Sequence, residues 1–195
     1  MFYLCGIVSS KQFFDMKKQL IATLVGGILL FLWQFLSWAL IPVHKAEYGY
    51  TPNQDKIIEA LNQNLTEEGT YMLPMPAPGS SSEQQQATMD SYMGKPWAQV
   101  TYHKAMSTEM GMNMFRGLVI DFVAVWLFIW LLSGASNLSI ATVVPKAVAV
   151  GVIGYLTIPY LNSIWFETSS LAHLVDAFVS WGAVGAWLGW WLPRE

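Results

Sequence analysis

Four long apolar runs, separated by polar segments, dominate the pattern of the chain. They cover residues 19–41, 112–133, 143–161 and 171–192. A helix needs about 20 apolar residues to cross a bilayer, and buried helices of soluble proteins rarely contain so many. Apart from Arg116, which flanks the second run, the ionisable residues inside the runs are Asp121, Lys146, His173 and Asp176. The pattern predicts an all-α membrane protein with a four-transmembrane-helix bundle.

Residues 42–116, between the first two spans, have the composition of a soluble segment. Thr51-Pro52, followed by apolar residues at helical spacing, predicts an amphipathic helix with proline in its first turn. The Ser80-x-x-Glu83 pattern is a capping box and predicts a second helix that ends at Gly94. We therefore expect a mostly helical extracytoplasmic insertion between spans 1 and 2.

Other parts of this insertion have weaker patterns. Residues 69–79 contain three prolines and predict an irregular connector. Residues 97–102 have strand propensity, but the sequence shows no partner strand. From Lys104 onward we expect a helix that continues straight into the second span.

Positive charges predict the orientation in the membrane. Three lysines precede the first span: Lys11, Lys17 and Lys18. Lysines that flank a first span usually stay in the cytoplasm, so residues 1–18 are expected to be cytoplasmic and the first span an uncleaved anchor. Four spans then place the C-terminus in the cytoplasm as well. Met16-Lys17-Lys18 is typical of a natural start, which makes residues 1–15 an upstream addition.

Composition narrows the range of partners. The chain has 54% apolar and 12% charged residues, about half the charged fraction of soluble domains. Its net charge of −3 lacks the basic excess that binds nucleic acid, so we expect no nucleic-acid partner. The single cysteine, Cys5, cannot form an intramolecular disulfide. The expected partners are the lipid bilayer and another membrane or periplasmic protein, or a second copy of the chain.

Polar residues gather at the predicted outer ends of the spans. This candidate ligand or polar cluster consists of Arg116, Asp121, Asn162, Glu167, His173 and Asp176, with His44 just after span one. His173 and Asp176 are three residues apart and share a helix face. Ionisable groups at such depth are costly unless they are paired or wetted. They predict either a structural clamp between helices or a ligand or proton site.

A methionine-rich stretch is the second candidate site. Its members are His103, Met106, Met110, Met112 and Met114. Three of the methionines repeat every four residues and form a stripe on one helix face. Thioethers beside a histidine suit Cu(I), although such a stripe more often packs against neighbouring helices. No other cofactor is required by the sequence.

Small residues at four-residue spacing predict close helix contacts. Gly185-x-x-x-Gly189 and Gly182-x-x-x-Ala186 lie in the fourth span, with similar pairs in the first and third. Such pairs let helix backbones approach, which predicts a tight bundle or a dimer. No motif of a common enzyme class is present, so the sequence favours a protein that is not an enzyme.

Several short segments together carry a family resemblance. They are Met16-Lys17-Lys18-Gln19-Leu20-Ile21-Ala22, Phe31-Leu32-Trp33-Gln34-Phe35, Lys95-Pro96-Trp97, Tyr102-His103-Lys104, Gly154-Tyr155-Leu156-Thr157-Ile158-Pro159-Tyr160 and Gly189-Trp190-Trp191-Leu192. With these segments the chain resembles a family of small four-span bacterial inner-membrane proteins, a domain of unknown function. The resemblance implies a multi-pass protein of the bacterial inner membrane. It implies no substrate and no catalytic residue.

Three functions follow as hypotheses. The first is a non-catalytic accessory or assembly subunit that contacts a periplasmic or membrane partner. The alternative is a Cu(I)-handling or metal-handling membrane protein that uses the Met106–Met114 stripe. A second alternative is a small transporter or intramembrane enzyme built on Asp121, His173 and Asp176.

Overall fold

The computed structural model describes residues 15–194, which form two compact units. The first unit combines residues 15–48 with residues 109–194, and the second consists of residues 49–108. The expectations for the upstream start and for Cys5 concern residues that lie outside the described part of the chain.

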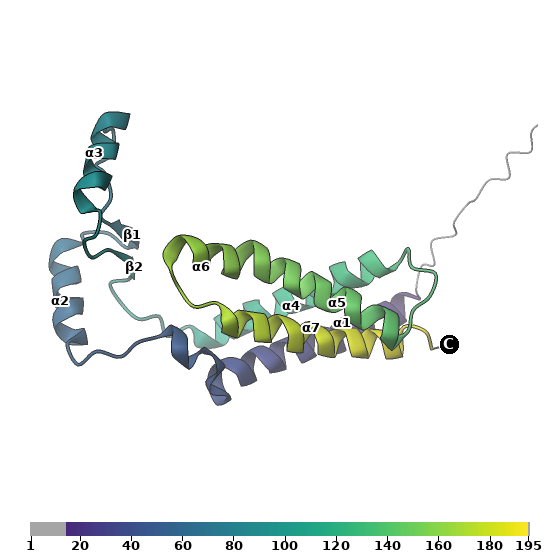
Figure 1. Ribbon diagram of the computed structural model, residues 1–195. Helices are drawn as coiled ribbons and strands as arrows, with labels where there is room; N and C mark the ends of the chain where they lie inside the picture. Colours follow the sequence, from purple (N-terminus) through teal and green to yellow (C-terminus); the bar gives the residue numbers. More distant parts are fainter. Residues whose placement is uncertain (1–14, 195) are drawn as a thin grey trace, which may run out of the picture. The chain divides into compact units, whose positions relative to one another are not determined.

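Four long helices, α1, α4, α5 and α7, lie side by side in the first unit (Figure 1). Their bounds are Met16–Phe35, Met110–Leu132, Ile140–Tyr155 and Leu171–Trp191. Helix α5 continues through the π-helix η3, Leu156–Tyr160, into α6, Leu161–Phe166. With these extensions, the four helices are long and apolar enough to cross a membrane. The predicted all-α class is confirmed.

The third of these helices starts earlier than its apolar run. It begins at Ile140, where Ser139 and Thr142 form a capping box. Pro145 therefore lies inside α5 and not in its first turn. Pro159 falls within the π-helical segment η3, where the regular hydrogen-bond pattern is already interrupted.

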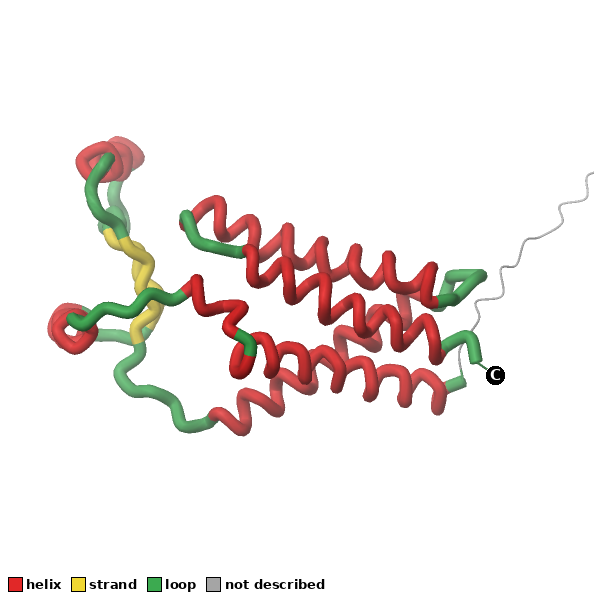
Figure 2. The backbone as a smooth tube through the Cα atoms, turned by 60° about the horizontal axis from the view of Figure 1, so that its bottom comes forward, coloured by secondary structure: helices red, strands yellow, loops and turns green. Residues whose placement is uncertain are grey.

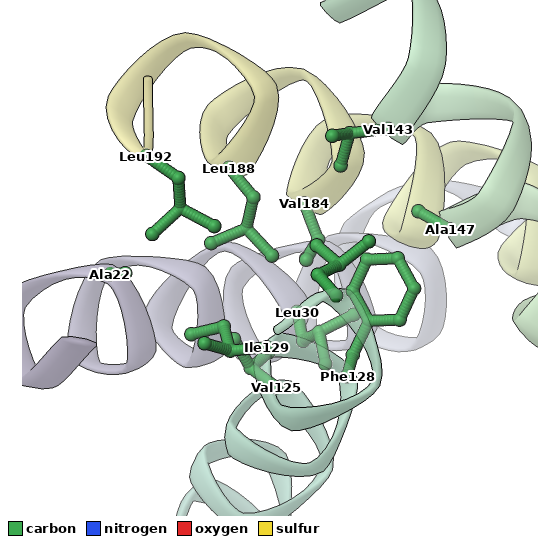
Figure 3. Packing of buried hydrophobic residues seen from close by; sticks show 11 residues of the cluster. Ala22, Leu30, Val125, Phe128, Ile129, Val143, Ala147, Val184, Leu188 and Leu192 are labelled. Carbon is green, nitrogen blue, oxygen red and sulfur yellow. The ribbon is translucent and has the colours of Figure 1, made fainter. Parts of the chain in front are cut away.

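An apolar core joins the four helices (Figure 3). Its most buried large side chains are Val125 and Ile129 on α4, Val143 on α5, and Val184 and Leu188 on α7. Within α4 and α7 these positions are four residues apart, so they lie on one helix face. The core therefore fixes which face of each helix points inward.

Small residues bring the helices into close contact. A Cβ atom at Gly189 would lie 2.7 Å from Ile140 Cα, and one at Gly185 would lie 2.8 Å from Ala147 Cβ. On α1, a Cβ atom at Gly26 would lie 2.7 Å from a methyl group of Val125. Larger side chains would push these helices apart, so the close contacts predicted for these glycines are confirmed.

The chain after α1 is wound irregularly. Helix α1 passes into the π-helix η1, Leu36–Leu40, and then into the 3₁₀-helix η2, Pro42–Glu47. Ile41 between them is extended, and the proline starts η2. This path brings Ser37 and His44 within hydrogen-bonding distance of α7.

The second unit contains a two-stranded antiparallel sheet, yellow in Figure 2, and two helices. Helix α2 spans Gln54–Asn64 and α3 spans Ser82–Tyr92. Strand β1, Gly69–Leu73, pairs with β2, Ala98–Tyr102. The Tyr102 hydroxyl donates a 2.7 Å hydrogen bond to Asn62 Oδ1 and so ties the sheet to α2.

The expectations for this unit are confirmed in part. Both helices form, but α2 begins at Gln54, so Pro52 lies before the helix and not in its first turn. The capping box of α3 uses Ser81 and Gln84, one residue later than predicted. Residues 69–73 are a strand and not a connector, because β2 supplies the partner from far along the chain. The expected helix from Lys104 is also wrong: α4 begins only at Met110, and the Lys104 N–H donates a 2.9 Å hydrogen bond to Glu68 Oε1.

Candidate metal centre

Asp176, near the start of α7, collects hydrogen bonds from the end of α1 and the segment that follows it. Its Oδ1 accepts one bond from Trp33 Nε1 at 2.9 Å and another from Ser37 Oγ at 2.6 Å. Its Oδ2 lies 2.8 Å from His44 Nε2. Three polar partners thus converge on the one carboxylate of Asp176.

His44 lies between two carboxylates. Its side chain is only 4% exposed, and its ring stacks on Trp38 with 3.9 Å between the ring centroids. While Nε2 faces Asp176, Nδ1 lies 3.1 Å from Glu47 Oε2, one turn later in η2. An ionised carboxylate only accepts hydrogen bonds, so two carboxylates around the ring favour its charged form, in which both nitrogens donate.

The same neighbours change the pKa of His44. Burial alone lowers the pKa of this ring, because it disfavours the charged form. The hydrogen bonds and negative charges of Glu47 and Asp176 together outweigh burial and raise the pKa above its usual value of 6.5. Through these two contacts His44 links η2 to α7.

A second histidine completes the group. His173 packs edge-on to His44 with 5.1 Å between the ring centroids, and its Nε2 lies 3.6 Å from Glu47 Oε2. Ligand atoms of His44, His173 and Asp176 all lie within 4.8 Å of one another. We call His44, Glu47, His173 and Asp176 the polar centre.

The polar centre offers the donor atoms of a transition-metal site. Zn²⁺ binds histidine nitrogens and carboxylate oxygens at about 2.0–2.2 Å, so tetrahedral ligand atoms lie about 3.4 Å apart. Two of the ligand atoms, His44 Nε2 and Asp176 Oδ2, lie 2.8 Å apart, and the ligand atoms of the full group with His173 lie within 4.8 Å of one another. Glu47 Oε1 is also buried and has no hydrogen-bond partner among the described residues. Small side-chain shifts would therefore place these groups around an ion.

The residues of the predicted polar cluster lie in different places. His173 and Asp176 are in the polar centre, as is His44. Three others are exposed, and no described hydrogen bond or ion pair joins them to the centre: Arg116, Asn162 and Glu167. Sequence reasoning missed Glu47, although its position three residues after His44 was a visible signal.

Asp121 forms a separate contact. It lies on α4 with 4% of its surface exposed, and its Oδ1 accepts a 2.9 Å hydrogen bond from Gln34 Nε2 on α1. No described contact joins it to the polar centre.

The methionine candidates are divided between the two units. His103 and Met106 line an open cavity of about 580 Å³ in the second unit, and Met106 is 95% exposed. Three methionines belong to α4 in the first unit, where each is at least 40% exposed: Met110, Met112 and Met114. Their exposure shows that they do not pack in the core of the first unit.

Comparisons of the chain with family models, curated proteins and solved structures give no match. The resemblance to four-span inner-membrane proteins therefore stays a prediction.

Proposed function

We propose that this chain is a multi-pass membrane protein that binds a divalent transition-metal ion, with Zn²⁺ as the best match, in the polar centre. The observation that carries this proposal is the approach of ligand atoms of His44, His173 and Asp176 to within 4.8 Å. Glu47 accepts a hydrogen bond from His44 Nδ1 and orients the ring, as carboxylates commonly do behind metal-binding histidines. Three protein ligands leave one tetrahedral position for water or an exchanging ligand.

The ligand types also favour this ion over Cu(I). Imidazole and carboxylate groups suit Zn²⁺ and its neighbours in the first transition series, whereas Cu(I) prefers soft sulfur ligands. The methionine hypothesis would use other residues, on exposed surfaces. Metal binding is therefore proposed at the histidines and carboxylates, and Cu(I) binding at the methionines stays a prediction.

Exposed apolar surface supports membrane insertion. Four large side chains of α4 are each at least half exposed: Ile120, Trp126, Trp130 and Leu131. A helix with this outer face would be insoluble in water but matches the hydrocarbon core of a bilayer. The 21 residues of α7 rise about 32 Å, which is enough to cross that core.

Basic residues support one orientation. Lys17 and Lys18 start α1, and Arg194 follows α7. Trp191 Nε1 donates a 3.2 Å hydrogen bond to the Lys18 carbonyl, so these charges share one end of the bundle. Because basic residues favour the cytoplasmic side, we propose that both termini are cytoplasmic and that the polar centre lies at the opposite face.

Metal titration of the purified protein tests the proposal. The protein in detergent is stripped with a chelator and titrated with Zn²⁺ by calorimetry, with bound metal counted by mass spectrometry. We expect one ion per chain. His173→Gln and Asp176→Asn each remove a ligand and should abolish this binding, while Glu47→Gln should weaken it about 10–100-fold, as expected for a residue that orients a ligand.

His103→Gln is the matched control, because His103 is an exposed histidine of the second unit. It should bind Zn²⁺ like the unaltered protein. If the polar-centre variants keep full affinity, or if only His103→Gln loses it, the metal proposal is wrong and the centre is a hydrogen-bonded clamp.

Assembly with a partner and transport both stay predictions. Purification in mild detergent from native membranes, with identification of co-purifying proteins, tests the accessory-subunit hypothesis. A monodisperse monomer that purifies alone would contradict it.

A further inference from the structure

Asp121 is a buried carboxyl group that the polar centre does not use. One oxygen, Oδ1, accepts the hydrogen bond from Gln34. The other, Oδ2, is buried and has no hydrogen-bond partner among the described residues. With 4% of the residue exposed, water supplies little compensation. Asp121 therefore accepts one hydrogen bond, whereas an ionised carboxylate can accept about four.

No positive charge is placed to balance Asp121. Helix α1, which packs against α4, has no charged residue between Lys18 and the end of its apolar run. The other charged residues and histidines of α4, α5 and α7 are Arg116, Lys146, His173 and Asp176. Among the described residues, none of these groups forms an ion pair with Asp121.

Asp121 and Asp176 differ in burial and in the number of polar partners that they face: Asp176 is 20% exposed, whereas Asp121 is 4% exposed. Asp176 accepts from Trp33 and Ser37 and lies against His44, whereas Asp121 has only Gln34. An unpaired negative charge inside a bilayer costs several kcal/mol, more than the neutral acid does. Asp121 lacks the set of polar partners that surrounds Asp176 and that could balance such a charge.

We infer that Asp121 is a proton-binding site: inside the bundle it is held as a neutral carboxylic acid beside Gln34. This goes beyond metal binding and rests only on the membrane insertion in the proposed function. Trp33 and Gln34 are consecutive on α1 and donate to Asp176 and Asp121, respectively. The hydrogen-bond partner of Asp121, Gln34, is therefore the neighbour in sequence of Trp33, which donates to Asp176 in the polar centre.

A lipophilic carbodiimide tests this inference in membranes that contain the full chain. Dicyclohexylcarbodiimide reacts with protonated carboxyl groups: the acid adds across a C=N bond, its proton moves to nitrogen, and the adduct rearranges to a stable N-acylurea. After reaction at pH 7.5, peptide mass spectrometry should find the adduct on Asp121 and not on Asp176.

Two variants sharpen the test. Asp121→Asn should lose the adduct, and Gln34→Leu, which removes the one donor that stabilises the anion, should increase the rate of modification. If Asp121→Asn does not fold, the peptide map of the unaltered chain still decides the question. An unmodified Asp121, in membranes where the reagent modifies other proteins, would overturn the inference.

Added Na⁺ distinguishes a bound proton from a bound metal cation at Asp121. If Na⁺ at constant pH protects Asp121 from the reagent, the site binds a metal cation and the proton assignment is overturned. Unchanged modification in Na⁺ supports the proton. Zn²⁺ titration of the same preparation reports on the polar centre separately, so failure of one proposal is distinguishable from failure of the other.

Discussion

His44 connects parts of the chain that are 132 residues apart in sequence. The ring nitrogens contact Glu47 in the same short helix and Asp176 on α7, while one ring face lies on Trp38. In the metal-free protein the charged ring holds the two carboxylates together. A bound metal ion would take over that role, since it is also a positive charge between them.

The raised pKa of His44 predicts that the contribution of this residue to the stability of the metal-free protein is greatest in mild acid. Below its usual pKa of 6.5, the ring is charged in both the folded and unfolded chain, and its stabilising contribution is fully present. As the pH rises further, the unfolded chain loses the proton first. The contribution then declines and is lost above the folded-state pKa.

We therefore expect the melting temperature, measured with a chelator present, to fall between pH 6 and pH 9. His44→Gln, which has no titrating ring, should flatten this part of the profile. A melting temperature that rises over this range in the unaltered protein, and falls in the variant, would contradict the assignment.

The polar centre was predictable from sequence only in part. His173 and Asp176 share a helix face, so their three-residue spacing identifies them as neighbours from the helical repeat alone. Their distance to His44 depends instead on the irregular turns of residues 36–47, which hydrophobic patterning does not describe. Ser37 and Trp33 gave no signal, because nothing distinguishes them from other residues of an apolar span.

At the scale of the elements, irregular helices position the site and glycines position the helices. The π-helix η1 delivers Ser37 and Trp38, and short π segments of this kind occur often at functional sites. Helices α5 and α7 approach closely where Gly185 and Gly189 face α5. The small size of glycine predicts close helix contacts from the sequence, whereas no residue pattern predicts the π-helical turns.

Two glycines of α7 provide a matched pair of substitutions. At Gly189 a Cβ atom would lie 2.7–2.8 Å from backbone atoms of Ile140, but at Gly182 the nearest atom, in a methyl group of Val148, would be 4.0 Å away. Gly189→Ala should destabilise the protein by about 1–3 kcal/mol, as overpacking does. Gly182→Ala should change stability by less than about 0.5 kcal/mol.

Thermal unfolding in detergent, followed by circular dichroism, measures both. Equal melting temperatures for the two alanine variants would show that α5 and α7 are not packed as described.

The pairing of strand β1 could not be predicted from the sequence. Its register with β2 joins Gly69 to Tyr102, and no local pattern encodes such a distant partner.

At the scale of the whole molecule, the proposed four-span topology has one orientation in the membrane. The second unit, residues 49–108, and the loop between α4 and α5 should lie on opposite sides. The four apolar runs predicted the number of long helices, because the thickness of a bilayer requires about 20 consecutive, mostly apolar residues in each span. The side that each loop faces depends instead on a few basic residues at the ends of the spans.

Cysteine labelling tests this orientation. In a chain with Cys5→Ala, a cysteine at Gln86 in α3 should react with a membrane-impermeant maleimide in intact cells. A cysteine at Ser136, between α4 and α5, should react only after the cells are opened. The reverse pattern would invert the orientation, and labelling of both from outside would contradict the four-span arrangement.

X-ray absorption at the zinc edge tests the central claim, metal binding by the polar centre, most directly. The chain is loaded with one equivalent of Zn²⁺ and its spectrum is compared with that of His173→Gln. We predict a first shell of nitrogen and oxygen atoms at about 2.0–2.2 Å from the zinc ion. The outer-shell scattering should correspond to two imidazole rings in the unaltered chain and to one ring in the variant. A shell with sulfur at about 2.3 Å, or one without imidazole, would contradict metal binding by these residues.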